Sequence, residues 1–204
     1  MLDRIEERFR HLTPQGDFCS LRFVREHTEM LGVRQDIVQP VGTSDNSGAM
    51  LTVYHNAGMG YAATSDLSLS GLQRAATRAH DWAEQSAGHS LVDFSKIRMT
   101  PPQGEYSTPE GLPWHSTALP DKIALLQEEC RRLKTDARIV DWEASLCYTE
   151  TDTLYLTSDG GRVYQHFVYL VPMLSATANA GAETQSRTFG GRGYCRQGGL
   201  EVLE

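Results

Sequence analysis

Residues 58–68 read Gly-Met-Gly-Tyr-Ala-Ala-Thr-Ser-Asp-Leu-Ser, and an alanine-rich segment follows them. Residues 50–55 alternate as a strand does, and a turn at 56–58 leads into an extended partner, which predicts a β-hairpin. From about Leu69 to Ala87 the chain predicts a helix, with Gly88 suited to its end. Its apolar stripe is expected to consist of Leu72, Ala75, Ala76, Ala79, Trp82 and Ala83. Small side chains let a helix lie close to a sheet, so a helix packed on a hairpin is expected.

The segments around this unit extend the same pattern in both directions. A short amphipathic helix is predicted at 2–12, a second long helix at about 121–135, and a Pro-rich connector at about 90–118. The remaining segments predict strands at 18–25, 33–38, 139–148, 153–157, 162–171, 173–182 and 185–194, with turns at 42–48 and 158–161 and a break at Pro172. This order favours one α+β domain over 1–204. It would be a mixed, mainly antiparallel sheet with two principal helices and a short N-terminal helix packed on it.

The composition limits the classes of partner. The chain has 26 acidic and 19 basic side chains, a formal charge of −7. This balance disfavours direct binding to nucleic acid, which needs clustered Lys and Arg. The sequence contains no run of 18 apolar residues, so no membrane span is predicted. The charged N-terminus lacks the apolar core of a signal peptide. A cytoplasmic location is therefore expected. The four scattered cysteines are expected to be free thiols.

A search for catalytic motifs gives no assignment. The chain contains no His-Glu-x-x-His zinc helix, no Gly-x-Ser-x-Gly elbow and no Walker loop. His80 and Glu84 stand four residues apart on the predicted helix, but two ligands are too few for zinc. We therefore predict no catalytic residue and no metal ligand. One hypothesis is a metal-independent hydrolase that uses Cys147 or Cys195 as its nucleophile. A packed thiol is the simpler interpretation of Cys147.

The glycine-rich end of the chain is the candidate binding segment. A phosphate loop should open a helix, whereas only 11 residues follow Gly193. A bend or bulge in an edge strand is the structural interpretation. The alternative is a strand that lies beside a bound peptide, because glycine permits close approach. The candidate substrate-binding residues are Arg187, Gly190, Gly191, Arg192 and Gly193.

Three segments together resemble the TldD/PmbA family. They are the stretch at 58–68 with its alanine-rich helix, Leu156-Thr-Ser-Asp-Gly-Gly161, and Arg187-Thr-Phe-Gly-Gly-Arg-Gly-Tyr194, in the family's order. The resemblance implies an N-terminal α+β domain. In the family a second domain carries a His-Glu-x-x-x-His zinc motif with a distant Cys ligand. Members, which have been called modulators of DNA gyrase, are understood as dimeric peptidases that act on unfolded or modified peptides.

The sequence departs from the family in one respect. It contains no His-Glu-x-x-x-His, so no catalytic residue is carried over, and zinc is expected only in the family's C-terminal domain, which is absent here. The first hypothesis is therefore the non-catalytic half of a metallopeptidase, inactive alone, which binds substrate peptide or unfolded protein and forms a homo- or heterodimer with a TldD/PmbA-like subunit. The alternative is a stand-alone peptide- or protein-binding scaffold without catalysis.

Overall fold

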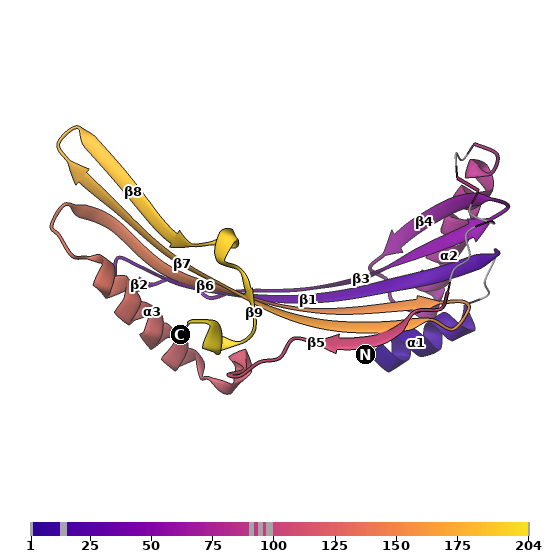
Figure 1. Cartoon of the computed structure of the whole chain (residues 1–204), viewed down its shortest axis with the longest axis horizontal. Helices are drawn as coiled ribbons and strands as arrows, with labels where there is room; N and C mark the ends of the chain where they lie inside the picture. Colours follow the sequence, from indigo (N-terminus) through magenta and orange to yellow (C-terminus); the bar gives the residue numbers. More distant parts are fainter. Residues whose placement is uncertain (1, 13–15, 90–91, 94–95, 97–99, 204) are drawn as a thin grey trace. The chain divides into compact units, whose positions relative to one another are not determined.

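The computed structural model describes residues 2–12, 16–89, 92–93, 96 and 100–203 and has the predicted α+β fold (Figure 1). Its helices are α1 (Leu2–His11), α2 (Leu69–Ser86) and α3 (Leu119–Leu133), with 3-10 helices η2 (Trp114–Ser116), η3 (Arg192–Tyr194) and η4 (Leu200–Leu203). Its strands are β1 (Phe18–Arg34), β2 (Ile37–Val38), β3 (Gly42–His55), β4 (Gly58–Thr64), β5 (Gln103–Ser107), β6 (Ile139–Thr157), β7 (Arg162–Ala180), β8 (Glu183–Gly190) and β9 (Arg196–Gln197). No helix among the described residues is long and apolar enough to cross a membrane.

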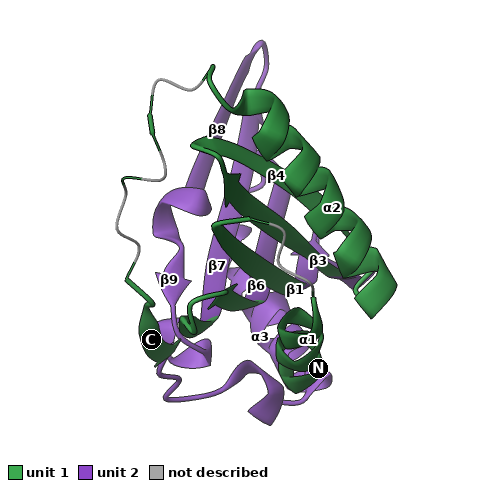
Figure 2. Cartoon of the chain, turned by 90° about the vertical axis from the view of Figure 1, so that its right-hand side faces the viewer, with its two compact units in different colours: residues 1–26, 46–107, 151–166 green, residues 27–45, 108–150, 167–204 purple. Residues whose placement is uncertain are grey.

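The sheet has the order β4-β3-β1-β6-β7-β5, with β2 paired to β1 and both β8 and β9 paired to β7. The hairpins β3–β4 and β7–β8 are antiparallel, whereas β5 runs parallel to β7, so the sheet is mixed as expected. The chain divides into two compact units: residues 1–26, 46–107 and 151–166 form unit 1, and the remaining residues form unit 2 (Figure 2). Four of the long strands, β1, β3, β6 and β7, contribute residues to both units.

Unit 1 has the predicted helix packed on the predicted hairpin (Figure 2). The Ser68 hydroxyl caps α2 by accepting from the Gly71 amide at 3.1 Å. The helix lies so close to β4 that a Cβ on Gly60 would stand 2.0 Å from the Ala79 carbonyl oxygen. This close approach explains why the helix face toward the hairpin carries alanines, four of which are buried in the core. Trp82 was wrongly placed in the apolar stripe: it is 54% exposed, because the contact uses only the narrow face that carries the small side chains.

Unit 2 has its own core, under α3. It consists of Leu31, Val33, Trp114, Leu126, Cys130, Ala144, Leu146, Tyr148, Val168, Leu170 and Leu200. Helix α3 contributes Leu126 and Cys130, and the Cys130 thiol donates to the Val33 carbonyl at 3.3 Å. Lys122, on the same helix, is also buried, which no local sequence pattern predicted.

Several strands are longer than the sequence predicts. Residues 42–48, expected to be a turn, are extended in β3, and β6 runs without a break between the two strands expected at 139–148 and 153–157. Asp152, which falls between those two expected strands, lies within β6 and accepts from the Tyr164 hydroxyl at 2.6 Å. In these segments the polar side chains are exposed or paired across strands, and they do not indicate a change in chain direction.

The break expected at Pro172 is likewise absent, since β7 runs through it. The Pro172 carbonyl still accepts a hydrogen bond, from the Gly191 amide at 2.8 Å, so the strand keeps a partner where proline has no N–H to give. The predicted turn at 158–161 is confirmed, with Gly160 at φ +95°.

The connector predicted at 90–118 lies partly outside the described residues, at 90–91, 94–95 and 97–99. Its later part is structured, because it contains β5 and the buried Trp114. The C-terminal segment holds it: the Glu201 carboxylate accepts from the Leu112 amide at 2.7 Å and from the Gly199 amide at 2.9 Å. Backbone donors, that of Leu112 first, lower the pKa of Glu201 to about 2.

Candidate functional site

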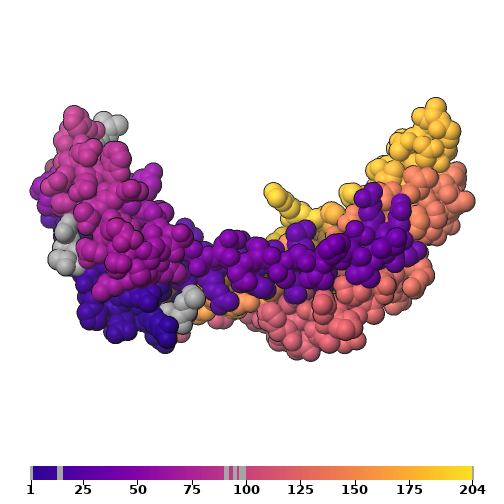
Figure 3. Space-filling model, turned by 180° about the vertical axis from the view of Figure 1, so that it is seen from behind, coloured from indigo at the N-terminus to yellow at the C-terminus, as the bar shows by residue number. Residues whose placement is uncertain are grey.

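Strand β8 forms an edge of the sheet in unit 2. It pairs with β7 from Ala180↔Glu183 to Met173↔Gly190, and no other described strand pairs with it. All its residues except Gly190 are exposed, and the yellow part of the chain lies at the surface in the space-filling view (Figure 3). An exposed edge presents unpaired backbone donors and acceptors to any extended chain that approaches.

The register tells which backbone groups of β8 face away from β7. The Gly191 amide bonds the Pro172 carbonyl, one step beyond the Met173↔Gly190 pair. Because bonded and non-bonded pairs alternate in an antiparallel ladder, the odd-numbered residues of β8 direct their amides toward β7. The N–H and C=O groups of Thr184, Ser186 and Thr188 therefore point away from the sheet.

The glycine-rich segment ends this strand. Gly190 has φ +88°, and a Cβ there would stand 2.1 Å from the Pro172 oxygen, so only glycine fits without displacement. Gly191 has φ +71°, and the chain then turns into η3. The strand expected over 185–194 thus stops at Gly190. Of the five predicted binding residues only Arg187 and Gly190 lie on the edge strand, and Gly191, Arg192 and Gly193 lie beyond its end.

Basic side chains lie on the edge strand and in the segment that follows it. The Arg187 guanidinium donates to the outward-facing Ser186 carbonyl at 2.9 Å. Arg192 is exposed in η3, and the Arg196 guanidinium stands 4.5 Å from the centre of the Tyr194 ring. These cations would attract acidic groups of a peptide, although a surface charge of this kind contributes modestly to affinity in salt.

An apolar pocket of about 360 Å³ opens beside the end of β8. Its lining consists of Leu125, Leu126, Glu129, Ser145, Leu146, Pro172, Met173, Leu174, Phe189, Tyr194, Val202 and Leu203. Phe189 is 58% exposed, and its ring centre lies 5.3 Å from that of Tyr194. No local sequence pattern predicted the pocket, because its residues come from α3, β6, β7, β8 and the C-terminal segment. The aromatic residues that flank the glycines were the one local signal.

A buried polar network lies elsewhere in unit 2. Lys122 keeps 5% exposure, its ammonium is 4.0 Å from a Glu29 carboxylate oxygen with 18% exposure, and it stands 3.6 Å from the Trp114 ring centre. The Trp114 indole N–H donates to the same carboxylate, and the ring stacks on Tyr148 at 4.9 Å. Burial lowers the pKa of Lys122, whereas Glu29 opposes this change. Each polar group has a partner, which fits a structural role.

Unit 1 has a second cavity of about 460 Å³, between α1 and the strand ends around 156–162. Both arginines in its lining are already engaged, Arg162 by Glu6 at 3.2 Å and Glu105 at 2.6 Å, and Arg10 by Glu6 at 2.5 Å. The cavity is larger than the pocket beside β8, but its charged groups satisfy one another, so it has less to offer a ligand.

The remaining candidates are dispersed. Cys19 and Cys130 are buried, and burial raises the pKa of Cys19 to about 11. Cys147 is half-buried in β6 and Cys195 is exposed, and among the described residues no hydrogen bond joins either thiol to a histidine. His80 and Glu84 lie on α2 in unit 1, as predicted.

Comparisons with known proteins find a family model and several solved structures that are similar to this chain. Residues 19–83 match the family model described as PmbA/TldA metallopeptidase domain 1. A search of curated proteins finds no match. The solved structures share the fold at low sequence identity, and the chain spans less than half of each of them.

Three of these structures cover nearly the whole chain. A candidate modulator of DNA gyrase from Bacteroides thetaiotaomicron has 15% identity and a TM-score of 0.69, over 92% of this chain and 43% of that one. TldE from Thermococcus kodakarensis has 14% identity and a TM-score of 0.62, over 94% and 43%. A candidate gyrase modulator from Thermotoga maritima has 11% identity and a TM-score of 0.63, over 93% and 42%.

Proposed function

We propose that this chain, whose residues 19–83 match domain 1 of the PmbA/TldA metallopeptidase family, supplies the peptide-binding part of such an enzyme and not its catalytic centre. The observation that carries the proposal is the free edge of β8 beside an apolar pocket. The residues of this chain do not fit the family's catalytic metal, because the sequence contains no His-Glu-x-x-x-His.

The proposed binding mode is strand addition. An unfolded peptide has unpaired main-chain groups, and it can bond the outward N–H and C=O groups of Thr184, Ser186 and Thr188 without any sequence requirement. A side chain that faces the pocket can contact Phe189 and Tyr194, which adds a preference for apolar residues. Arg187 and Arg192 add a preference for acidic ones.

We also propose that the domain associates with a second TldD/PmbA-like subunit. Unit 2 exposes four apolar side chains close together in sequence, Met30, Ile37, Val38 and Val41. Ile37 and Val38 form the whole of β2, a two-residue strand. Exposed apolar side chains of this kind are typical of protein interfaces.

The test is peptide binding by the 204-residue chain, measured by fluorescence anisotropy with a labelled, unstructured, acidic peptide that contains apolar residues. Thr188→Pro removes one outward N–H and puts a ring at the edge, while the ladder to β7 is kept. We expect affinity to fall about tenfold, since loss of one main-chain hydrogen bond and of close approach costs about 1.4 kcal/mol.

The matched control is Thr188→Ala, which changes the same side chain and keeps the N–H, so affinity should be unchanged. The double variant Arg187→Ala/Arg192→Ala should weaken binding at low salt and approach wild type at high salt. Equal affinity for wild type, Thr188→Pro and the double variant would remove β8 as the binding site.

A further inference from the structure

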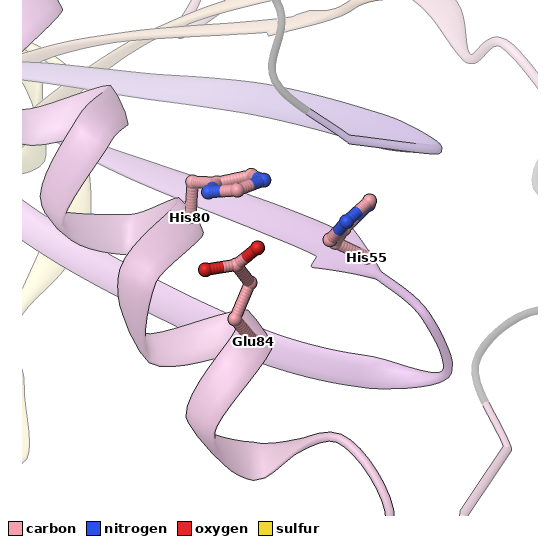
Figure 4. Close-up of side chains that lie close together, drawn as sticks. All are labelled: His55, His80 and Glu84. Carbon is pink, nitrogen blue, oxygen red and sulfur yellow. The ribbon is translucent and has the colours of Figure 1, made fainter.

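Two side chains of α2 and one at the end of β3 meet in unit 1. His80 and Glu84 are one helical turn apart and share a face of α2, and His55 is the last residue of β3 (Figure 4). One nitrogen of each imidazole and one oxygen of the Glu84 carboxylate lie within 4.8 Å of one another. The two rings are in contact, with centres 4.7 Å apart and planes inclined by 35°.

The hairpin geometry brings His55 to the helix. Asn56 and Ala57 both have positive φ, which makes a tight two-residue turn and sets the pair His55↔Gly58. A Cβ on Gly58 would stand 2.1 Å from the Ala83 oxygen, so the first residue of β4 touches the α2 backbone between His80 and Glu84. The residue paired with Gly58 is therefore held beside these two side chains.

The ligand atoms are available. Nδ1 of His55 is buried and has no hydrogen-bond partner among the described residues, while Nε2 lies 3.0 Å from the side-chain amide nitrogen of Asn56. A 180° flip of the Asn56 amide, which exchanges its nitrogen and oxygen, would let the oxygen accept from Nε2–H and leave the lone pair of Nδ1 for a metal ion. The described structure gives the side chains of His80 and Glu84 no hydrogen bond or ion pair of their own.

We propose that His55, His80 and Glu84 bind a divalent transition-metal ion, with Zn²⁺ as the best match. Two imidazole nitrogens and one carboxylate oxygen form a donor set that zinc accepts, and water would complete the tetrahedron. The nitrogen ligands disfavour Ca²⁺ and Mg²⁺. Bonds of about 2.1 Å place tetrahedral ligands about 3.4 Å apart, so side-chain rotations that close the present separations are sufficient.

The bound ion would add a link between the β3–β4 hairpin and α2. These elements already meet through close glycine–alanine contacts and through the Ser86 hydroxyl, which accepts from the Met59 amide and donates to the Met59 carbonyl, both at 2.9 Å. This site is distinct from the zinc motif expected in the family's second domain, and it does not rest on the proposed peptide binding. It also revises the expectation of no metal ligand. That expectation considered His80 and Glu84 alone, because His55 is 25 residues away from His80 in the sequence.

The test is a Co²⁺ titration of the untagged, chelator-treated 204-residue chain, followed by displacement with Zn²⁺. We expect one Co²⁺ per chain, with the visible absorption of a tetrahedral site, and competition by Zn²⁺. Each of His55→Ala, His80→Ala and Glu84→Gln should weaken binding by at least about tenfold. His11→Ala removes an exposed histidine of α1 and should leave binding unchanged.

Glu84→Gln keeps the size of an exposed side chain, so it keeps the test readable if a histidine variant is unstable. Zn²⁺ should raise the melting temperature of wild type and of His11→Ala, but not that of Glu84→Gln. The proposal is overturned if the chain shows no saturable Co²⁺ binding, or if Glu84→Gln binds and is stabilised as wild type is.

Discussion

Replacement of Glu29 by alanine lowers the free energy of unfolding by about 3 kcal/mol, the lower end of the range for breaking a buried ion pair. Glu29 is the partner of two groups that cannot reach water, the Lys122 ammonium and the Trp114 indole N–H. The variant leaves the Lys122 ammonium without its counter-charge and the Trp114 N–H without its acceptor. We choose the lower end because Glu29 itself keeps 18% exposure. Urea unfolding at neutral pH measures the effect.

The matched control is Glu128→Ala, which breaks an exposed ion pair with Arg132 at 2.7 Å in the same unit. Its cost should be below about 0.5 kcal/mol. The double variant Glu29→Ala/Lys122→Met removes both charges and should recover part of the lost stability. A Glu29→Ala cost no larger than that of Glu128→Ala would show that the network does not stabilise unit 2.

Replacement of Gly60 by alanine is the second large effect, with an expected loss of about 3 kcal/mol in the free energy of unfolding. The added Cβ would meet the Ala79 oxygen at 2.0 Å, the Ala83 nitrogen at 2.5 Å and the Trp82 Cβ at 2.7 Å. Two of these atoms are helix backbone, so α2 must move away from β4 and its packing in unit 1 is lost.

Gly104→Ala is the control, because a Cβ at Gly104 in β5 meets nothing within 4 Å. It should be neutral or slightly stabilising, since alanine restricts the unfolded chain. Thermal and urea unfolding of both variants decide the matter. Equal stability of Gly60→Ala and Gly104→Ala would mean that the close approach of α2 to β4 is not needed.

Local sequence signals predicted the elements that depend on neighbours in the chain. The α2 start at Leu69, the turn at 158–161 and the β3–β4 hairpin are set by caps, glycines and alternation within a few residues, and all three are confirmed. The resemblance to the family is confirmed through residues 19–83 and through the fold.

Features that depend on distant residues were not predictable in the same way. Residues 42–48 are polar, yet they extend β3, because their backbone is paired within the sheet and their side chains are exposed. Lys122 looked like a surface residue of α3 until Glu29 and Trp114 provided its partners. His55 joins His80 and Glu84 only through the hairpin.

The edge strand was predicted from its glycines, but over residues 185–194, whereas β8 spans Glu183–Gly190. The sequence indicated a glycine-rich edge strand, but it gave no sign that Gly190 and Gly191 would take positive φ and end the strand. The pocket beside it needed residues from α3, β6, β7 and the C-terminal segment, which no local pattern links.

Amide hydrogen exchange of the 204-residue chain, with and without an unfolded acidic peptide, tests the central claim most directly. Strand addition at β8 should slow exchange of the Thr184, Ser186 and Thr188 amides, which point away from the sheet. The amides of the odd-numbered residues already bond β7 and should change little. Protection of these three alternate amides is the result we predict. Peptide binding that leaves them unprotected, or that protects a different surface, would contradict the account.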